Sequence, residues 1–328
     1  MNLKDNISQT ERYPISQGLN ISLSVIIVNY NLADEIENCL NSFLETVGLM
    51  GKLKYEIIIV DNNSPDKKLP LIEKKYANSI VSFYYLSENI GFGKGCNYGF
   101  SKASGEYVLF LNPDTIVKDN IFEPILSELK KNESIGIIAP NQQTKPPFFD
   151  FSAGFYPNIF YEILNLFGIG VFFEGFLIHS LSRINRFKCF KVGWILGAAI
   201  FIRAELFRKV KGFDNDYFMF FEEVDLCKRV SDLGYKVIYW PGLKIHHIGS
   251  VSGKKDYRLY TIRTYSSKYL YITKHYNSIY KSFMKLLLYL QLFSQILIWA
   301  ILIFKCKEKS KQKISALFFL IKNKFRLN

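Results

Sequence analysis

The sequence predicts an α/β fold in which a mostly parallel β-sheet is flanked by helices and followed by a basic, helical C-terminal region. Two observations predict the sheet. Apolar runs of five to seven residues recur along the first 140 residues, as in strands covered on both faces. Segments whose apolar residues have helical spacing separate these runs. A third observation concerns the tail, which holds the whole excess of positive charge.

The expected elements alternate between strand and helix. Residues 22–28 (SLSVIIV) and 55–60 (YEIIIV) are continuous apolar strands, and the helix between them places Ile36, Leu40 and Phe43 on one stripe. The expected strands span residues 22–28, 55–60, 80–86, 107–111 and 135–139. The expected helices span residues 33–47, 92–103 and 119–132, and one more helix follows a turn at 62–65 and ends near residue 77. Repeated β-α-β units at this spacing favour parallel strands with right-handed crossovers.

Polar residues follow the strands at the edge of the sheet where ligands of such folds bind. They are Asn29, Tyr30 and Asn31 after the first strand, Asp61, Asn62, Asn63 and Ser64 after the second, Asn89, Gly91, Gly93 and Gly95 after the third, and Asn112, Pro113 and Asp114 after the fourth. Each alone is typical of a turn. Their convergence on one edge indicates a binding site. The glycines begin a helix, where free N–H groups favour phosphate, although their spacing matches neither a G-x-G-x-x-G loop after the first strand nor a Walker A loop.

The charge distribution argues against a nucleic-acid-binding protein. Residues 254–328 contain 16 Lys and Arg and 2 Asp and Glu, whereas the rest of the chain contains 26 and 27. A basic nucleic-acid binder carries its charge on the folded body, which is neutral here. The hydrophobic content of 49% excludes a disordered chain.

The cysteines and the first 20 residues predict a cytoplasmic protein. The five cysteines are scattered and none has C-x-x-C spacing, so we expect neither disulfides nor a cysteine zinc site. Residues 1–20 are polar, carry charges of both signs and lack the apolar core of a secretory signal.

The tail has the composition of a membrane-associating segment. Residues 286–304 are apolar, basic residues flank them, and a shorter apolar run follows at 314–321. Nineteen residues could span a bilayer. Three polar residues, Gln291, Ser294 and Gln295, interrupt the run, and a single span would place a basic stretch on the outer side. We favour interfacial helices or a shallow hairpin over a span, with a buried soluble helix as the third alternative.

An aromatic-rich segment lies between the predicted sheet and the later motifs. Residues 146–190 are rich in Phe and Tyr. We interpret them as an insertion over an acceptor site, where exposed aromatic side chains would favour a lipid-linked molecule or the bilayer interface. A helical hairpin packed on the body is the alternative.

Six ordered motifs carry a resemblance to a known family. They are SVIIVNYN, EIIIVDNNS, ENIGFGKGCNYG, YVLFLNPD, GAAIFIRAELFRKVKGFD and FFEEVDLCKRVSDLGY. The chain resembles the family 2 glycosyltransferases of GT-A fold, and among them the rhamnosyltransferase-type members that build bacterial surface polysaccharides. The resemblance covers residues 21–255 and leaves a polar extension at 1–20 and a basic helical region at 256–328.

The resemblance assigns a donor site and a divalent metal, Mg²⁺ or Mn²⁺. Asp61 and Asn62 occupy the nucleotide-base position, and Asn112-Pro113-Asp114 occupies the D-x-D position, whose last carboxylate holds the metal. Because Asn112 brings no charge, it suggests weaker metal binding. The donor-binding set predicted in this way is Asn29, Tyr30, Asp61, Asn62, Asn89, Gly91, Gly93, Asn97 and Asn112.

The acidic motif at 222–225 would supply the catalytic base. The resemblance assigns that role to Glu223, since a carboxylate near a sugar hydroxyl can take its proton as the hydroxyl attacks the anomeric carbon. Asp225 shares the cluster as a second catalytic candidate and could instead pair with Arg229 four residues on. Acidic residues that merely complement the dipole of a helix are the alternative.

The resemblance also places a histidine ligand and an acceptor region. His247 fits the family spacing to Ser252, so we prefer it to His246 as the second metal ligand, after a strand at 236–240. A histidine pair at a strand end is the alternative. The acceptor region comprises Trp194, Gly197, Ala198 and Glu222.

The expected function is inverting transfer of a sugar, L-rhamnose by resemblance, from a nucleoside-diphosphate donor to a lipid-linked saccharide in O-antigen or capsule synthesis. The enzyme would work at the cytoplasmic face of the cell membrane. A non-catalytic nucleotide-sugar-binding scaffold is one alternative, suggested by Asn112 and Glu223. A sugar nucleotidyltransferase is another, but residues 29–40 lack the basic loop that grips a triphosphate.

Overall fold

A computed structural model describes residues 21–48, 53–76, 80–143, 149–186, 188–249 and 256–325. The polar extension at 1–20 and Ser252 lie outside the described residues.

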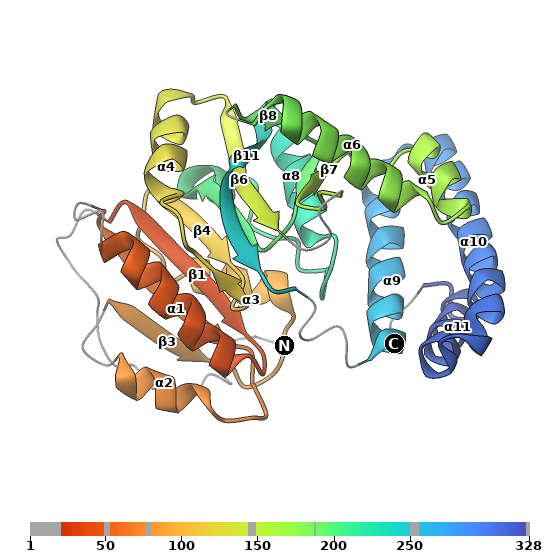
Figure 1. The fold of residues 1–328 in the computed structure, drawn as a ribbon, viewed down its shortest axis with the longest axis horizontal. Coiled ribbons are helices and arrows are strands. Elements are labelled where there is room, and N and C mark those ends of the chain that lie inside the picture. The colour runs from red at the N-terminus through yellow and green to blue at the C-terminus, as the bar shows by residue number, and fades with distance from the viewer. Residues whose placement is uncertain are drawn as a thin grey trace.

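The central sheet confirms the predicted fold class, because its first four strands in chain order are parallel and most of it is covered by helices (Figure 1). Its strand order is β3-β2-β1-β4-β10-β6-β11-β5, with β8 paired to β11. The strands are β1 (Leu23–Asn29), β2 (Tyr55–Asp61), β3 (Val81–Tyr85), β4 (Tyr107–Leu111), β5 (Thr115–Ile116), β6 (Ile135–Gln143), β8 (Phe190–Lys191), β10 (Ala199–Arg203) and β11 (Lys236–His247). Strand β10 runs antiparallel between β4 and β6. A small second sheet pairs β7 (Ala153–Gly154) with β9 (Trp194–Ile195).

Helices cover both faces of the sheet and bury its alternating apolar side chains. Val25 and Ile27 of β1 pack in one core with α1, α2 and α4, while Ile26 and Val28 pack in the other with α3, α7 and α8. These helices are α1 (Ala33–Gly48), α2 (Leu69–Lys75), α3 (Phe92–Phe100), α4 (Phe122–Lys131), α7 (Ala204–Lys209) and α8 (Glu222–Asp232).

Several boundaries differ from the sequence predictions, among them the end of β6, which continues to Gln143 rather than ending at residue 139. Helix α3 ends at Phe100 rather than residue 103, because residues 101–103 form a turn with backbone bonds to Tyr98, Gly99 and Phe100. Helix α4 spans Phe122–Lys131 rather than 119–132. Strand β11 continues to His247 rather than ending at residue 240. Its register shifts between Trp240 and Lys244, and pairing with β6 resumes beyond the shift, so Pro241 marks an irregularity within the strand.

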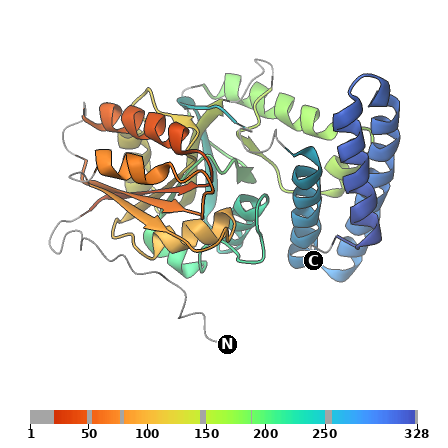
Figure 2. The same cartoon turned by 90° about the horizontal axis from the view of Figure 1, so that it is seen from below.

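The insertion and the tail form one helical unit beside the sheet. It contains α5 (Ile159–Leu166), α9 (Tyr257–His275), α10 (Ser278–Ile301) and α11 (Lys307–Lys322), and α6 (Gly170–Ile184) connects α5 to the sheet domain. Met284, Leu288 and Leu292 of α10 pack with apolar residues of α9 and α11. Helices α10 and α11 lie on the side of the molecule away from β1–β3 in both views (Figures 1 and 2). The helix at 278–304 is long and apolar enough to cross a membrane by length and composition.

Candidate functional site

Asn29, Asp61 and Ser64 hold the ends of β1 and β2 together. The Asn29 amide donates to Asp61 Oδ1 at 2.6 Å and to Ser64 Oγ at 3.0 Å, and the Ser64 N–H donates to Asp61 Oδ2 at 3.0 Å. All three side chains are buried. These contacts fix the two loops, so donor binding by Asn29 and Asp61 stays a prediction.

Asn62 connects the second strand to the third loop. Its amide donates to Asn89 Oδ1 and to the Gly91 carbonyl, both at 3.0 Å, and its Oδ1 accepts from the Ile90 N–H. Tyr30, which follows the same edge of the sheet, is 41% exposed and is therefore available to a ligand. Tyr30, Asn62 and Asn89 thus lie at one edge of the sheet, as the sequence predicts.

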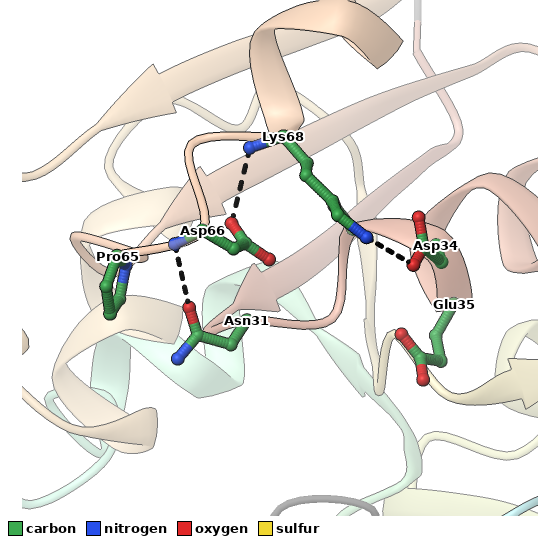
Figure 3. Close-up of a pocket in the computed structure, with 7 residues that line it drawn as sticks. Asn31, Asp34, Glu35, Pro65, Asp66 and Lys68 are labelled. Carbon is green, nitrogen blue, oxygen red and sulfur yellow. Dashed lines mark hydrogen bonds and ion pairs between the residues drawn. The ribbon is translucent and has the colours of Figure 1, made fainter.

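A cavity of about 540 Å³ opens beside the ends of β1 and β2 (Figure 3). It is lined by Asn31, Ala33, Asp34, Glu35, Pro65, Asp66 and Lys68. Lys68 Nζ pairs with Asp34 Oδ2 at 2.7 Å across it, and Asn31 Oδ1 accepts from the Asp66 N–H at 3.3 Å. The cavity therefore lies between residues that directly follow β1 and residues that follow β2.

The glycines at the start of α3 allow close packing against the backbone and side chains of residues 213–218. Gly91 has a φ of 90°, and a Cβ there would lie 2.3 Å from the carbonyl oxygen of Phe218. A Cβ on Gly93 would lie 3.1 Å from Phe213 Cβ. The Phe92 N–H donates to the same Phe218 carbonyl at 3.0 Å. A side chain at Gly91 or Gly93 would therefore collide with the protein, and donor binding by the backbone at these two positions stays a prediction.

Asp114 and His247 meet at the paired strands β5 and β11. Asp114 Oδ1 lies 3.2 Å from His247 Nε2, and the Asn112 amide lies 3.5 Å from the same nitrogen. His247 lies opposite Thr115 in the strand pair, and His246, next along the strand, is exposed. Because successive strand residues point to opposite faces, only His247 faces Asp114. The structure thus supports the preference for His247 over His246.

The donor atoms of Asp114 and His247 fit a shared divalent cation. Two ligands about 2.1 Å from one octahedral ion lie about 3.0 Å apart, close to the observed spacing. Nδ1 of His247 is buried without a hydrogen-bond partner. Among the described residues, no cluster of three or more His, Cys, Asp or Glu could hold a metal. A cation here would thus take its remaining ligands from the amide of Asn112, the substrate or water.

Glu222 and Glu223 begin α8 as two buried carboxylates. Oε2 of each is buried without a hydrogen-bond partner. Burial raises the pKa of Glu223 to about 7, and burial together with the neighbouring Glu223 charge raises the pKa of Glu222 well above its usual range. A carboxylate whose pKa lies near neutrality suits proton transfer at physiological pH.

The turn at Gly197 and Ala198 joins the acidic motif to the metal ligands. A Cβ on Gly197 would lie 3.9 Å from Glu223 Cβ, and the Ala198 carbonyl accepts from the Asn112 N–H at 2.9 Å. Trp194 donates to the Phe155 carbonyl at 2.9 Å. Of the residues predicted for the acceptor region, Gly197 and Ala198 therefore lie between the predicted base and the D-x-D position.

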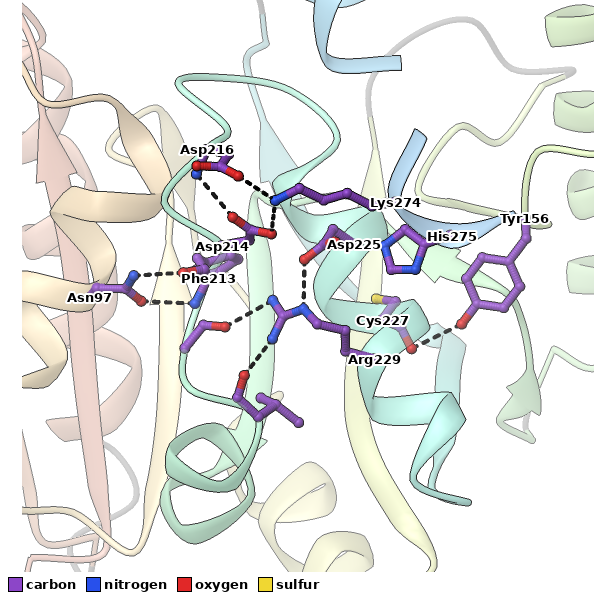
Figure 4. A network of polar contacts seen from close by, with 12 residues as sticks. Asn97, Tyr156, Phe213, Asp214, Asp216, Asp225, Cys227, Arg229, Lys274 and His275 are labelled. Carbon is purple, nitrogen blue, oxygen red and sulfur yellow. Dashed lines mark hydrogen bonds and ion pairs between the residues drawn. The ribbon is translucent and has the colours of Figure 1, made fainter. Parts of the chain in front are cut away.

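Asp225 and Asn97 both belong to the network of polar contacts drawn in Figure 4. Asp225 Oδ2 pairs with Arg229 Nε at 2.7 Å, as the sequence spacing predicts, and its Oδ1 lies 2.6 Å from His275 Nε2. Asn97 exchanges two 2.8 Å hydrogen bonds with the Phe213 backbone. Both side chains hold the protein together, so direct roles in catalysis or donor binding have no support in these contacts.

Sequence reasoning missed the side chains that fix this site from outside the motifs. Buried Gln142 of β6 accepts from the Ala198 N–H at 3.1 Å and donates to the Leu196 carbonyl at 2.8 Å. Tyr260 and His275 of α9 approach Glu223 and Asp225. The sequence analysis assigned α9 to the membrane because of its charge. Helix α9 has no apolar run like the one at residues 286–304, and this difference in sequence distinguishes α9 from the rest of the tail.

Comparisons with known proteins agree with this arrangement. Rhamnosyltransferase WbbL of Escherichia coli (strain K12) is 27% identical over 240 residues, which cover 68% of this chain and 82% of that protein. The N-acetylglucosaminyl-diphospho-decaprenol L-rhamnosyltransferase of Mycobacterium tuberculosis (strain ATCC 25618 / H37Rv) is 23% identical over 268 residues, 78% of this chain and 85% of that protein.

Two solved structures share the fold. The mannosyltransferase PcManGT from Pyrobaculum calidifontis, in complex with GDP-Man and Mn²⁺, has a TM-score of 0.53 at 16% identity and covers 93% of this chain and 76% of its own. GalNAc-T7 with UDP, GalNAc and Mn²⁺ has a TM-score of 0.56 at 17% identity, covering 71% of this chain and 44% of its own. The model of the family described as glycosyl transferase family 2 matches residues 24–189. The chain belongs to glycosyl transferase family 2 and is similar to its rhamnosyltransferase members.

Proposed function

We propose that this glycosyltransferase is metal-dependent and inverting, and that it moves a sugar from a nucleoside-diphosphate donor to a lipid-linked saccharide. The observation that carries the proposal is the Gly197-Ala198 turn, which has the buried base candidate Glu223 on one side and the Asn112 backbone on the other. One position beside this turn can therefore lie between a proton acceptor and a cation site.

In this mechanism, the acceptor hydroxyl oxygen attacks the anomeric carbon while its proton passes to Glu223. The bond from the anomeric carbon to the diphosphate oxygen breaks, and the nucleoside diphosphate leaves with the electron pair. Attack from the face opposite the leaving group inverts the anomeric configuration, the geometry that inverting glycosidases also use. A divalent cation held by Asp114 and His247 would neutralise the charge of the leaving diphosphate.

The donor would lie along the ends of β1 and β2. Tyr30 is exposed there, and the neighbouring cavity is large enough for a nucleoside. Two relatives are named for rhamnosyl transfer, so we propose dTDP-L-rhamnose as the first donor to test. Neighbours of the same fold that were solved with GDP-Man or UDP make other nucleotide sugars the next donors.

The acceptor and the membrane would meet the protein at its helical unit. One relative is named for a diphospho-decaprenol acceptor. Exposed apolar side chains lie on three helices of this side, namely Phe160 and Ile163 of α5, Val171, Phe172, Phe173 and Phe176 of α6, and Ile279, Phe283, Leu286, Leu290, Phe293, Leu297 and Ile301 of α10. We propose peripheral attachment through this surface to the cytoplasmic face of the cell membrane.

Replacement of Glu223 tests the catalytic assignment. Glu223→Gln keeps the shape of the side chain but removes its proton-accepting capacity, so we expect transfer to fall by about 10²–10⁴-fold. The assay measures release of dTDP from dTDP-L-rhamnose with Mn²⁺ and a lipid-diphosphate N-acetylglucosamine acceptor. Glu205→Gln, an exposed acid in the first turn of α7, is the matched control.

Each result of that assay has a distinct meaning. Equal rates for wild type and Glu223→Gln would refute the base assignment. A wild type that binds nucleotide sugars by calorimetry but transfers none of them to a panel of lipid-linked acceptors would favour the non-catalytic scaffold.

A further inference from the structure

The loop that leads into the acidic motif is held by α9 along its length. This loop, Phe213–Phe221, is called the 213–221 loop below. The Arg263 guanidinium lies 4.4 Å from the Phe218 ring centre, Ser267 Oγ donates to the Met219 carbonyl at 2.9 Å, and the rings of Tyr260 and Phe220 lie 4.9 Å apart. Contacts therefore run from the first turn of α9 towards its last.

Two residues in the last turn of α9 add polar contacts. Lys274 Nζ lies 2.5 Å from Asp214 Oδ2 and 2.6 Å from Asp216 Oδ2, at the start of the loop. His275 Nε2 lies 2.6 Å from Asp225 Oδ1, in the first turn of α8. Figure 4 shows both pairs extending from the same helix end. The two contacts lie before and after the residues that place Glu223.

The residues directly before Glu222 need such support. Phe220 and Phe221 have φ values of 72° and 65°, in the left-handed region that bulky residues avoid. Such a conformation persists only where its surroundings hold it, and strained backbone of this kind is concentrated at functional sites. The ring contacts of Phe220 with Tyr260 and of Phe221 with Tyr271 come from α9.

The charge of Asp225 does not need His275 for neutralisation. Arg229 already pairs with Asp225 on the same helix and also donates to the carbonyls of Val210 and Gly212. His275 lies on α9, 50 positions after Asp225 in the chain, so its contact with Asp225 fixes the position of α8 relative to α9.

We propose that α9 is part of the active site, with Lys274 and His275 as positioning residues that set the location of Glu223. The proposal rests on the catalytic role proposed above for Glu223. It extends the catalytic machinery into the region after residue 255, which the sequence motifs do not reach.

Three variants test the proposal on the full chain. His275→Ala removes the contact to Asp225, Lys274→Ala removes the contacts to the loop, and His275→Gln restores a donor at the position of Nε2. Because a displacement of about 1 Å can cost about 10²-fold in rate, we expect kcat to fall by 10- to 100-fold in the alanine variants. The KM for dTDP-L-rhamnose and the Kd for dTDP with Mn²⁺ should change by less than about threefold, since the donor contacts are elsewhere. His275→Gln should recover most of kcat.

Lys228→Ala is the matched control, because it removes a lysine–aspartate pair within α8 that does not involve α9. Active protein is quantified by calorimetric dTDP binding, so unfolded molecules do not count towards kcat. If both alanine variants keep wild-type kcat per active molecule, or if Lys228→Ala loses as much as they do, α9 has no positioning role.

Glu223→Gln, measured in parallel, separates this proposal from the proposed function. Loss of activity in Glu223→Gln with normal rates in the α9 variants refutes the positioning role alone. Normal activity in Glu223→Gln refutes the base assignment and, with it, the positioning of that base.

Discussion

Glu223 combines three properties at the scale of a single residue. The residue is half-buried, its buried Oε2 has no hydrogen-bond partner, and its pKa is raised to about 7. Its titratable neighbours are Glu222 and Cys227 on the same helix and Tyr260 on α9. Desolvation of this carboxylate gives a base that is ready to accept a proton near neutral pH.

The pH dependence of transfer should report this pKa. A base works only when it is deprotonated, and a raised pKa moves that requirement upwards from about 4.5 to about 7. We therefore expect kcat/KM to fall about tenfold for each pH unit below 7 and to level off above it. The measurement is the rate between pH 5.5 and 8.5 at saturating Mn²⁺. A flat profile down to pH 5.5 would contradict the raised pKa.

The D-x-D position offers a gain-of-binding prediction. Asn112→Asp would add a second negative charge beside Asp114 and His247, so we expect Mn²⁺ to bind at least about tenfold more tightly. Asp114→Asn should weaken Mn²⁺ binding by at least about 10–100-fold, the cost known for outer-shell partners. Calorimetric titration with dTDP present checks both. Wild-type affinity in both variants would remove Asp114 and Asn112 from the metal site.

The sequence predicted side chains whose chemistry is visible in a motif and missed those that act through geometry. Asp114, His247 and Glu223 were singled out because the family motifs place a carboxylate or an imidazole at these positions, and their roles stay predictions. Gln142 was missed because a glutamine within a strand carries no local signal of the turn it fixes. The close approach of the Phe218 backbone to Gly91 was missed as well, because a sequence does not show which distant segment packs against a glycine.

At the scale of elements, α10 shows why an apolar run is ambiguous. Gln291, which interrupts the run, is buried and accepts from Lys268 of α9 at 3.2 Å. Lys268 also pairs with Glu162 of α5 at 2.5 Å. The polar interruption is thus where α5, α9 and α10 meet. The sequence analysis treated the insertion and the tail separately, because a contact between residues 106 positions apart leaves no periodic pattern.

This buried pair should dominate the stability of the helical unit. Lys268→Met leaves Glu162 charged and unpaired in the interior, so we expect a loss of about 3–5 kcal/mol in the free energy of unfolding. Adding Glu162→Leu should recover most of it. Urea denaturation followed by tryptophan fluorescence measures both, with Lys68→Met of the exposed Asp34 pair as the control, whose loss should be much smaller because solvent screens that pair. A loss in Lys268→Met no larger than in Lys68→Met would contradict the argument.

At the scale of the whole molecule, the apolar side chains exposed on α10 lie on the helical unit, while the donor edge belongs to the sheet domain (Figure 2). The described lysines near the end of α10 are Lys305, Lys307, Lys309, Lys311 and Lys313. Apolar side chains and neighbouring lysines together suit the surface of an anionic bilayer.

Membrane attachment can be tested on this surface. Leu297→Glu combined with Ile301→Glu places charges where two exposed apolar residues lie, so we expect cosedimentation with phosphatidylcholine–phosphatidylglycerol vesicles to fall by at least about tenfold. Leu71→Glu, on the exposed face of α2, is the control and should bind as wild type does. Unchanged sedimentation of the double variant would exclude α10 as the attachment surface.

The short link between α9 and α10 has a practical consequence for anyone who wants a soluble form of the enzyme. Truncation of the chain at the end of the family motifs, near Gly249, would remove Lys274 and His275 together with the apolar helices. Trimming after Asn277 would remove α10 and α11 while sparing both side chains. The second version, however, strips α9 of the apolar side chains of α10 and α11 that pack on it and removes Gln291 from the buried Lys268. A shortened enzyme that keeps Lys274 and His275 in place therefore has to replace that packing surface, for example with polar substitutions on the uncovered face of α9.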